Sequence, residues 1–333
     1  MKKVNTENIN SIVVIQPAPF GDVLLTTSYF ETLKKNTGNA EITYVVRDPF
    51  QKIVQDHPFI DNLIIEKHIV GKGYFRERWK TIKKIRKVKP DLIIDQPGRK
   101  GTKIMTLFSG AKYKLGFKKT NFSFIYNLKA KQGPAVYNAS RKFDILGPLG
   151  IKKESYKLYY NIKDSSREYI NNWIKENGLQ DGKIITISPG SPDNKKRWKI
   201  NNYVKLADLL NSDPEKKIVL VWGPQEYEEA KLIESKMEST PYIAPETDLN
   251  QLAALLEKTS LLITNDGGVI HLSVTTATKT IAIFGPTDPK IWSPASEFDH
   301  HHHIVKEYKE GDNSFGITPE EVFEKAREVL GDE

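Results

Sequence analysis

Short runs of β-branched and aliphatic residues recur along the chain at intervals long enough to hold a helix, and this rhythm constrains the fold more than any other feature. The first half has such runs at 11–16, 42–46, 63–65 and 92–95, and the second half at 184–188, 218–222, 242–244, 261–264 and 280–284. Runs of this length, separated by helical segments, are typical of parallel sheets covered by helices on both faces. The sequence therefore predicts an α/β fold with two doubly wound sheets.

The rhythm is interrupted near residue 150, which indicates a boundary between two domains. A chain of 333 residues exceeds the size at which one hydrophobic core stops growing. A Gly147-Pro148-Leu149-Gly150 turn closes the first half, and a helix predicted over 165–177 opens the second. We expect domains at 1–160 and 161–333. A last helix, beginning after a Thr318-Pro319-Glu320-Glu321 start signal, is expected to end at Leu330, with the option of packing back on the first domain.

Composition excludes several classes of protein. The chain has no cysteine, so it has no disulfide scaffold, no thiolate metal site and no catalytic cysteine. No apolar run approaches the length of about eighteen residues that a membrane-spanning helix needs. The first ten residues are polar and do not resemble a signal peptide, so we expect the protein in the cytoplasm.

Positive charge is concentrated in one segment of the first half. The formal net charge is +8, yet segment 67–131 holds 19 lysines and arginines against three acidic residues. Such an excess suggests a polyanionic partner: a phosphorylated lipid, an anionic glycan, a membrane face or nucleic acid. Tyr74, Phe75 and Trp79 among these charges fit an interfacial surface as well as an RNA-binding one. The alternative is a solvated helix face over 80–89, and no nucleic-acid module accompanies the segment.

Two loops that follow predicted strands carry residues suited to chemistry, because ligand sites of α/β sheets lie at the carboxyl ends of strands. In 17–25, glycine permits a tight turn and Asp22 begins the next helix, where its carboxylate is either a helix cap or a general base. In 188–198, Ser191, Lys196 and Arg197 suit the binding of phosphate. A solvated basic loop is the alternative for the second segment.

Three further strand ends complete the set of candidates. In 264–272, Gly267 and Gly268 expose backbone N–H groups where a strand turns into a helix, which favours an anion. His271 in the same segment is either a core or capping histidine or a catalytic one. Thr287 lies on the turn 284–289, which either positions a ligand or only ends a strand. Glu226 follows the 218–222 run and offers acceptors to ribose hydroxyls.

Taken in order, four motifs resemble the heptosyltransferases of glycosyltransferase family nine, and the likeness spans nearly the whole chain. The motifs are Gly-Asp-Val-Leu-Leu-Thr-Thr, Asn-Lys-Lys-Arg-Trp, Thr-Asn-Asp-Gly-Gly-Val-Ile-His-Leu and Phe-Gly-Pro-Thr-Asp-Pro. The resemblance implies a GT-B fold, in which two Rossmann-like doubly wound domains face each other across a cleft. It also implies an acceptor-binding first domain and a second domain that binds a nucleotide-heptose, usually ADP-L-glycero-β-D-manno-heptose. Gly267 departs from the family pattern, in which Thr or Ser is common.

The resemblance implies roles for individual residues. Asp22 is the expected base that deprotonates the acceptor hydroxyl, so that direct attack inverts the anomeric carbon, and Lys196 is expected to stabilise the departing ADP. The expected donor-binding residues are Ser191, Lys196, Arg197, Glu226, Asp266, Gly267, Gly268, His271 and Thr287. The expected acceptor-binding residues are Gly21, Arg99 and Lys100.

The same reading predicts partners and cofactors. The expected partners are a nucleotide-sugar donor and an anionic glycolipid acceptor, whose Kdo carboxylates and lipid A phosphates match the basic segment, with peripheral contact to the cytoplasmic face of the inner membrane. No nucleic acid is expected. No cofactor or metal is expected either, because no Asp-x-Asp pair follows a strand and lysines supply the charge. The run His300–His303 is expected to be an exposed loop, since consecutive residues rarely converge on one ion.

Other functions remain open at this stage. The same fold accommodates a different nucleotide-sugar donor, or a protein or other glycan as acceptor. A non-catalytic nucleotide-binding or RNA-binding protein would explain the charge but would leave Asp22 without a role. An NAD-dependent oxidoreductase is disfavoured, because the Gly-x-Gly-x-x-Gly turn is absent after the first strand of both halves.

Overall fold

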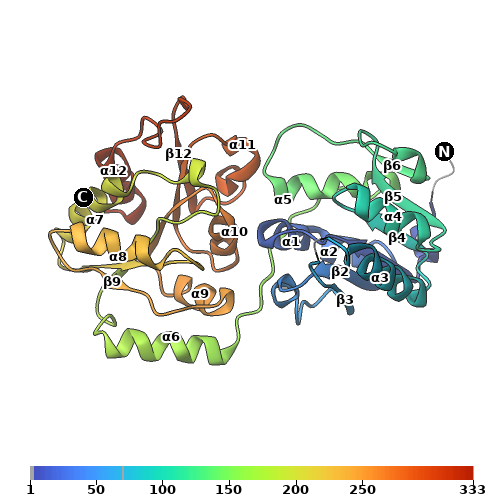
Figure 1. The fold of residues 1–333 in the computed structure, drawn as a ribbon, viewed down its shortest axis with the longest axis horizontal. Helices are drawn as coiled ribbons and strands as arrows, with labels where there is room; N and C mark the ends of the chain where they lie inside the picture. Colours follow the sequence, from blue (N-terminus) through green and yellow to red (C-terminus); the bar gives the residue numbers. More distant parts are fainter. Residues whose placement is uncertain (1–3, 70, 333) are drawn as a thin grey trace. The chain divides into compact units, whose positions relative to one another are not determined.

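The computed structural model describes residues 4–69 and 71–332 and divides into two compact units between Asn161 and Ile162 (Figure 1). Each unit is built around one six-stranded sheet, and the paired strands of both sheets are parallel. The predicted α/β fold with two doubly wound sheets is confirmed.

Unit 1 has the strand order β3-β2-β1-β4-β5-β6. Its strands are β1 (Ser11–Ile15), β2 (Glu41–Arg47), β3 (Asn62–Glu66), β4 (Leu92–Asp95), β5 (Tyr113–Phe117) and β6 (Leu128–Ala130). Its helices are α1 (Phe20–Thr26), α2 (Phe30–Lys35), α3 (Tyr74–Val88), α4 (Lys100–Phe108) and α5 (Asn138–Arg141), and a 3₁₀ segment, η5 (Lys142–Leu149), follows α5. The strand order reverses between β1 and β4, and the carboxyl ends beside such a reversal are where open α/β sheets bind ligands.

The core of unit 1 explains why the central strands were visible in the sequence. Strand β4 is buried at every residue and β1 is buried after its first one. Helix α3 covers this sheet with a stripe that includes Ile82 and Ile85, which belong to the same hydrophobic cluster as Val13 and Ile93. The lysines of α3 therefore point away from the core, as an amphipathic helix requires.

Unit 2 repeats this topology with the order β12-β11-β10-β7-β8-β9, so its strand order reverses between β7 and β10. Its strands are β7 (Lys183–Ser188), β8 (Lys216–Leu220), β9 (Tyr242–Ile243), β10 (Leu261–Asn265), β11 (Thr280–Phe284) and β12 (His301–Val305). Its helices are α6 (Asp164–Glu176), α7 (Ile200–Asn211), α8 (Tyr227–Lys236), α9 (Leu249–Leu256), α10 (Gly268–Thr275), α11 (Pro289–Trp292) and α12 (Pro319–Leu330). Helix α12 begins with the predicted capping box at Thr318, and it packs on α7 and β11 of its own unit (Figure 1).

The histidine run is a strand and not the exposed loop that the sequence predicted. Strand β12 pairs in parallel with β11 and forms an edge of the sheet. His301 is buried, and burial lowers its pKa to about 2. An edge strand is recognised in a sequence when apolar, buried residues alternate with polar, exposed ones. The expectation was wrong because three identical histidines show no such alternation in the sequence, although their burial alternates in the structure.

Candidate active site

The donor motifs expected from the sequence gather at the carboxyl edge of the unit 2 sheet. Segment 189–198 follows β7, segment 266–267 links β10 to α10, and segment 285–288 follows β11. Strands β7, β10 and β11 are neighbours, with β10 in the middle. Three segments that are distant in sequence therefore meet at the point where the strand order reverses.

Lys196, Asp266 and Thr287 form the centre of this edge, which we call the donor cluster. Lys196 Nζ lies 2.6 Å from Asp266 Oδ2, and Thr287 Oγ1 donates to the same oxygen at 2.6 Å. The Asp266 side chain is 4% exposed and that of Lys196 is 26% exposed. One buried carboxylate oxygen thus holds both a lysine ammonium and a hydroxyl in place, with the lysine still reachable from solvent.

Asn265, the last residue of β10, holds both ends of the loop that follows β7, and the sequence reasoning missed it. Its Oδ1 accepts from Trp198 N and from Tyr203 Oη, both at 2.9 Å, and its amide donates to Pro189 O. The side chain is buried, so each of these bonds fixes backbone or ring positions in a water-poor environment. A polar residue at the end of an apolar strand was the one available signal.

Gly267 and Gly268 lie where predicted, at the start of α10. Gly267 is the N-cap with φ −171° and ψ −175°, an extended conformation open to any residue. A Cβ there would meet only Asn265 O, at 3.9 Å, so the absence of the family's Thr or Ser reflects neither strain nor lack of space. His271 is buried within α10, with its ring centroid 6.3 Å from that of Trp292.

Arg197 and Glu226 are brought together, but they are engaged with protein groups. Arg197 Nε donates to Ser191 O at 2.7 Å, and its guanidinium pairs with Glu229 at 2.7 Å and Glu226 at 3.4 Å. Glu226 Oε2 accepts from Gly223 N at 2.9 Å. Burial raises the pKa of Glu229, although the Arg197 charge opposes that shift. Arg197 therefore braces the loop after β7, and Glu229 is a partner that the sequence reasoning missed.

Gly190 is needed for Glu226 to sit where it does. A Cβ on Gly190 would lie 2.1 Å from Glu226 Oε2 and 2.2 Å from its Cδ. Contacts under 3.0 Å force one of the two groups to move. The Glu226 carboxylate thus packs directly against the backbone of Gly190, where a larger residue would displace it.

In unit 1, Asp22 is the third residue of α1 and not its cap. Pro19 occupies the N-cap position, and no side chain caps this end of the helix. Asp22 Oδ1 pairs instead with Lys142 Nζ at 2.8 Å, and the Asp22 side chain is 29% exposed against 8% for Lys142. Gly21 lies beside it in the first turn of α1. The structure overturns the helix-cap interpretation and adds Lys142, the first residue of η5, which the sequence reasoning missed.

A polar cavity of about 190 Å³ in unit 1 shares Lys142 with Asp22. We call it the basic pocket, since Lys119, Arg141 and Lys142 supply three cations to its lining. The amides of Gln96, Gln132 and Asn138 line it as well. Its cations and amide donors suit a carboxylate or phosphate group.

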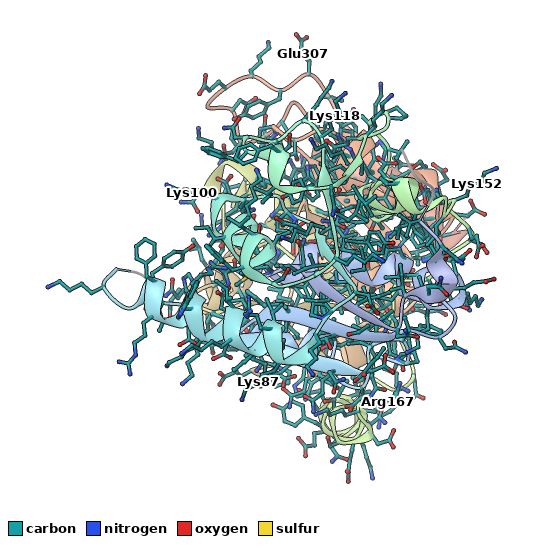
Figure 2. The ribbon with its side chains drawn as sticks, turned by 90° about the vertical axis from the view of Figure 1, so that its right-hand side faces the viewer. Lys87, Lys100, Lys118, Lys152, Arg167 and Glu307 are labelled. Atoms are coloured by element: carbon teal, nitrogen blue, oxygen red, sulfur yellow. The ribbon has the colours of Figure 1, made fainter. Side chains whose placement is uncertain are left out.

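Arg99 and Lys100 lie where predicted, after β4 at the start of α4. Both are exposed, and Thr102 Oγ1 accepts from Arg99 N at 3.1 Å, which fixes the first turn of the helix. Their side chains are not part of the lining of the basic pocket, to which this segment contributes Gln96 and Pro97. Figure 2 shows Lys100 at the surface.

Residues 4–69 and 71–332 hold no group of three or more His, Cys, Asp or Glu side chains placed to bind one metal ion. Within the same residues, no helix has both the length and the apolar character that crossing a membrane requires.

Comparison with known proteins gives consistent matches. The profile of glycosyltransferase family 9 (heptosyltransferase) matches residues 78–314. Lipopolysaccharide heptosyltransferase 1 of Campylobacter coli is 26% identical over 297 residues, which cover 83% of this chain and 84% of that protein. The crystal structure of a family 9 glycosyl transferase from Veillonella parvula has a TM-score of 0.87 and 25% identity and covers 99% of both chains. Escherichia coli heptosyltransferase WaaC with ADP-2-deoxy-2-fluoro heptose has a TM-score of 0.74 at 19% identity, with 96% of this chain and 99% of that chain covered, and shares the fold.

Proposed function

Since this chain belongs to glycosyltransferase family 9 and is a glycosyltransferase, we propose that it transfers heptose from ADP-heptose to an anionic acceptor of the lipopolysaccharide inner core. The donor cluster is the observation that carries this proposal. It combines a solvent-reachable ammonium, a fixed carboxylate and the start of a helix at the carboxyl edge of a doubly wound sheet, where nucleotides bind.

The donor cluster is suited to stabilising a departing nucleoside diphosphate. Negative charge grows on the diphosphate as the glycosidic bond breaks, and a positioned cation stabilises that charge most strongly in a water-poor site. Lys196 supplies the cation, and the first amides of α10 after Gly267 point toward an anion. Asp266 holds the ammonium in position, and its own carboxylate lies near the sugar.

Ser191, Glu226 and Thr287 are assigned to the donor with Lys196. Ser191 lies in the segment after β7 and Glu226 is the N-cap of α8, and Arg197 links the two segments. In this proposal Arg197 acts through Glu226, by holding the carboxylate that would accept from ribose hydroxyls. His271, which is buried within α10, is assigned to the donor site as well.

Unit 1 is assigned to the acceptor, with Asp22 as the general base. Lys142 holds Asp22 Oδ1, which orients the carboxylate so that Oδ2 takes the proton of the acceptor hydroxyl as that oxygen attacks the anomeric carbon. The bond from the anomeric carbon to the diphosphate oxygen breaks on the opposite face, so the configuration inverts. Gly21, Arg99 and Lys100 flank the acceptor, and the basic pocket takes one of its carboxylate or phosphate groups.

We expect no metal requirement, because Lys196 supplies the positive charge that a divalent ion supplies elsewhere. An inner-core acceptor is lipid-borne, so the enzyme would work at the cytoplasmic face of the inner membrane. Other nucleotide-sugars as donors, and a protein or another glycan as acceptor, use the same two groups of residues and remain the alternatives.

The test measures ADP release from ADP-heptose, in EDTA, with and without Kdo-lipid A. The proposal expects acceptor-dependent release that falls by about 10²–10⁴-fold in Asp22→Asn, because a positioned base contributes an effect of that size. ADP binding should be retained in this variant. Asp56→Asn is the matched control, since Asp56 is exposed, lies in the same unit and has a positive φ that asparagine tolerates. Equal activity in Asp22→Asn would overturn the base assignment, and no release with this substrate pair would overturn the assigned donor or acceptor.

A further inference from the structure

Helices α3 and α4 expose four large apolar side chains on one surface of unit 1, which we call the α3–α4 face. Phe75 is 76% exposed, Trp79 48%, Leu107 45% and Phe108 43%. Phe75 and Trp79 are one helical turn apart on α3, and Leu107 and Phe108 end α4. Exposed apolar groups are normal when scattered, but a contiguous patch marks a binding surface.

The four side chains form one patch because the two helices pack together. The rings of Trp79 and Phe108 are in edge contact, with centroids 5.5 Å apart and an interplanar angle of 73°. Between the helices, Arg78 Nη1 donates to Met105 Sδ at 3.3 Å. Figure 2 looks onto α3 and shows Lys87 on its outer side.

Cations lie beside this patch on α3 and at the end of α4, and two of them are held there by hydrogen bonds. Arg86 Nη1 donates to Phe108 O at 3.2 Å, and Lys114 Nζ donates to Leu107 O at 3.1 Å, so two cations hold the carbonyl end of α4. The other exposed cations of α3 are Arg76, Lys80, Lys83, Lys84 and Lys87; Lys80 pairs with Glu77 at 3.3 Å, and Lys84 donates to Ile65 O at 3.5 Å. Glu77 is the one acidic residue of α3, and it is buried.

We propose that the α3–α4 face docks on an anionic lipid bilayer. Phe75, Trp79, Leu107 and Phe108 would enter the boundary between headgroups and acyl chains, while the cations contact lipid phosphates. An apolar centre with a rim of lysine and arginine is the composition of interfacial membrane anchors. Nucleic acid would satisfy the cations but leave the aliphatic Leu107 and the end of α4 without a partner. This proposal rests on the proposed function, because docking on a membrane serves transfer to a lipid-borne acceptor. It adds to that function the surface that contacts the membrane.

The test is co-sedimentation of the purified protein with vesicles, without substrates. Vesicles of phosphatidylglycerol and phosphatidylethanolamine should bind the protein, pure phosphatidylcholine vesicles should bind it far less, and high salt should weaken binding. Trp79→Ser combined with Phe108→Ser should weaken binding at least about tenfold, because both side chains lose their apolar contact. Arg76→Gln with Lys83→Gln and Lys87→Gln, which spares the Lys80–Glu77 ion pair, should weaken it about 100-fold, at about fivefold for each cation.

Controls separate docking from folding and from catalysis. Leu232→Ser on α8 of unit 2 removes a leucine that is 41% exposed and should leave vesicle binding unchanged. The α3–α4 variants should retain transfer to a short-chain, water-soluble acceptor. If the proposed donor is wrong, the parent protein will show no transfer from ADP-heptose but will still bind vesicles, so the two proposals fail separately. Absence of binding to anionic vesicles, or equal binding by all variants, would overturn the proposal. Binding of an RNA oligonucleotide that depends on the same residues, without vesicle binding, would overturn it as well.

Discussion

Replacing Lys196 by methionine tests whether the donor cluster acts in catalysis or only in folding. The substitution keeps an unbranched side chain but removes the ammonium that lies 2.6 Å from Asp266 Oδ2. Asp266 then keeps Thr287 as a donor, while its carboxylate remains buried without a countercharge. Two separate losses are therefore expected, one in stability and one in rate.

The magnitudes follow from burial and from the bonds that are lost. Removing one partner of a fully buried ion pair costs about 3–5 kcal/mol, and a hydrogen bond to a charged group contributes about 1.5–3 kcal/mol. Lys196 is 26% exposed, so we expect about 2 kcal/mol of lost stability, less than for a fully buried ion pair and within the range for one hydrogen bond to a charged group. The rate falls because the negative charge that develops on the diphosphate loses its stabilising ammonium. Loss of one such stabilising group typically lowers kcat by about 10²–10³-fold.

The double variant Lys196→Met with Asp266→Asn separates the two losses. It removes the unpaired buried charge, so the free energy of unfolding in urea should return to within about 1 kcal/mol of the parent value. Tryptophan fluorescence, to which the buried Trp198 contributes, follows the transition. The kcat for ADP release should stay low, because no cation is restored. Lys195→Met is the matched control, an exposed lysine one residue away. Recovery of kcat in the double variant, or an unchanged stability of Lys196→Met, would refute the reasoning.

Two further predictions concern stability and its dependence on pH. Gly116→Ala should lower the unfolding free energy by about 1–3 kcal/mol, because the new Cβ would lie 2.4 Å from the Tyr126 ring. Gly267→Ala, where a Cβ has space, should leave stability nearly unchanged. Thermal unfolding measures both variants, and equal melting temperatures for the two would contradict the packing argument. Burial lowers the pKa of His57 to about 4, so the unfolded chain binds a proton there between pH 6.5 and 4 that the folded chain does not, and stability falls by about 3 kcal/mol as the pH drops through that window. His57→Asn, which keeps an acceptor for Phe59 N, should lessen this slope in urea titrations from pH 7 to 4, and an unchanged slope would show that another group causes it.

The sequence predicted the central elements well because their residues report burial directly. Strands β4 and β11 have the predicted bounds, and both are buried along their whole length. Strands β5, β6 and β12 were missed because polar residues or glycine interrupt them: Lys114 and Gly116 in β5, Lys129 in β6 and the histidines in β12. Strands β6 and β12 are edges of their sheets, where polar residues are tolerated and composition overlaps with that of loops, whereas β5 lies between β4 and β6 and is hidden only by its own Lys114 and Gly116.

The candidate site divides in the same way. The motifs after β7, β10 and β11 were recognisable, since a glycine or a cation directly after an apolar run is a local signal. Their partners were not recognisable, because Lys142 reaches Asp22 across 120 residues and Asn265 reaches Trp198 across 67. Contacts between polar residues that are far apart in the sequence become known only once the chain is folded.

The two units each contain a carboxylate held by a lysine, and the difference between the pairs supports their assigned roles. Asp22 follows β1 and pairs with Lys142, while Asp266 follows β10 and pairs with Lys196, so both carboxylates lie beside a reversal of strand order. Exposure is divided in opposite ways within the two pairs. In unit 1 the carboxylate is the more exposed partner, at 29% against 8%, whereas in unit 2 the lysine is, at 26% against 4%.

The group that a substrate can reach is the group that can act on it. A base must contact the proton it removes, and of the two carboxylates Asp22 is the one with exposed surface. A cation that stabilises a leaving group must contact the diphosphate, and of the two lysines Lys196 is the exposed one. The buried partners, Lys142 and Asp266, then orient the reactive groups, so substitution of either should lower kcat through its neighbour and change KM for the corresponding substrate less than loss of the exposed partner does.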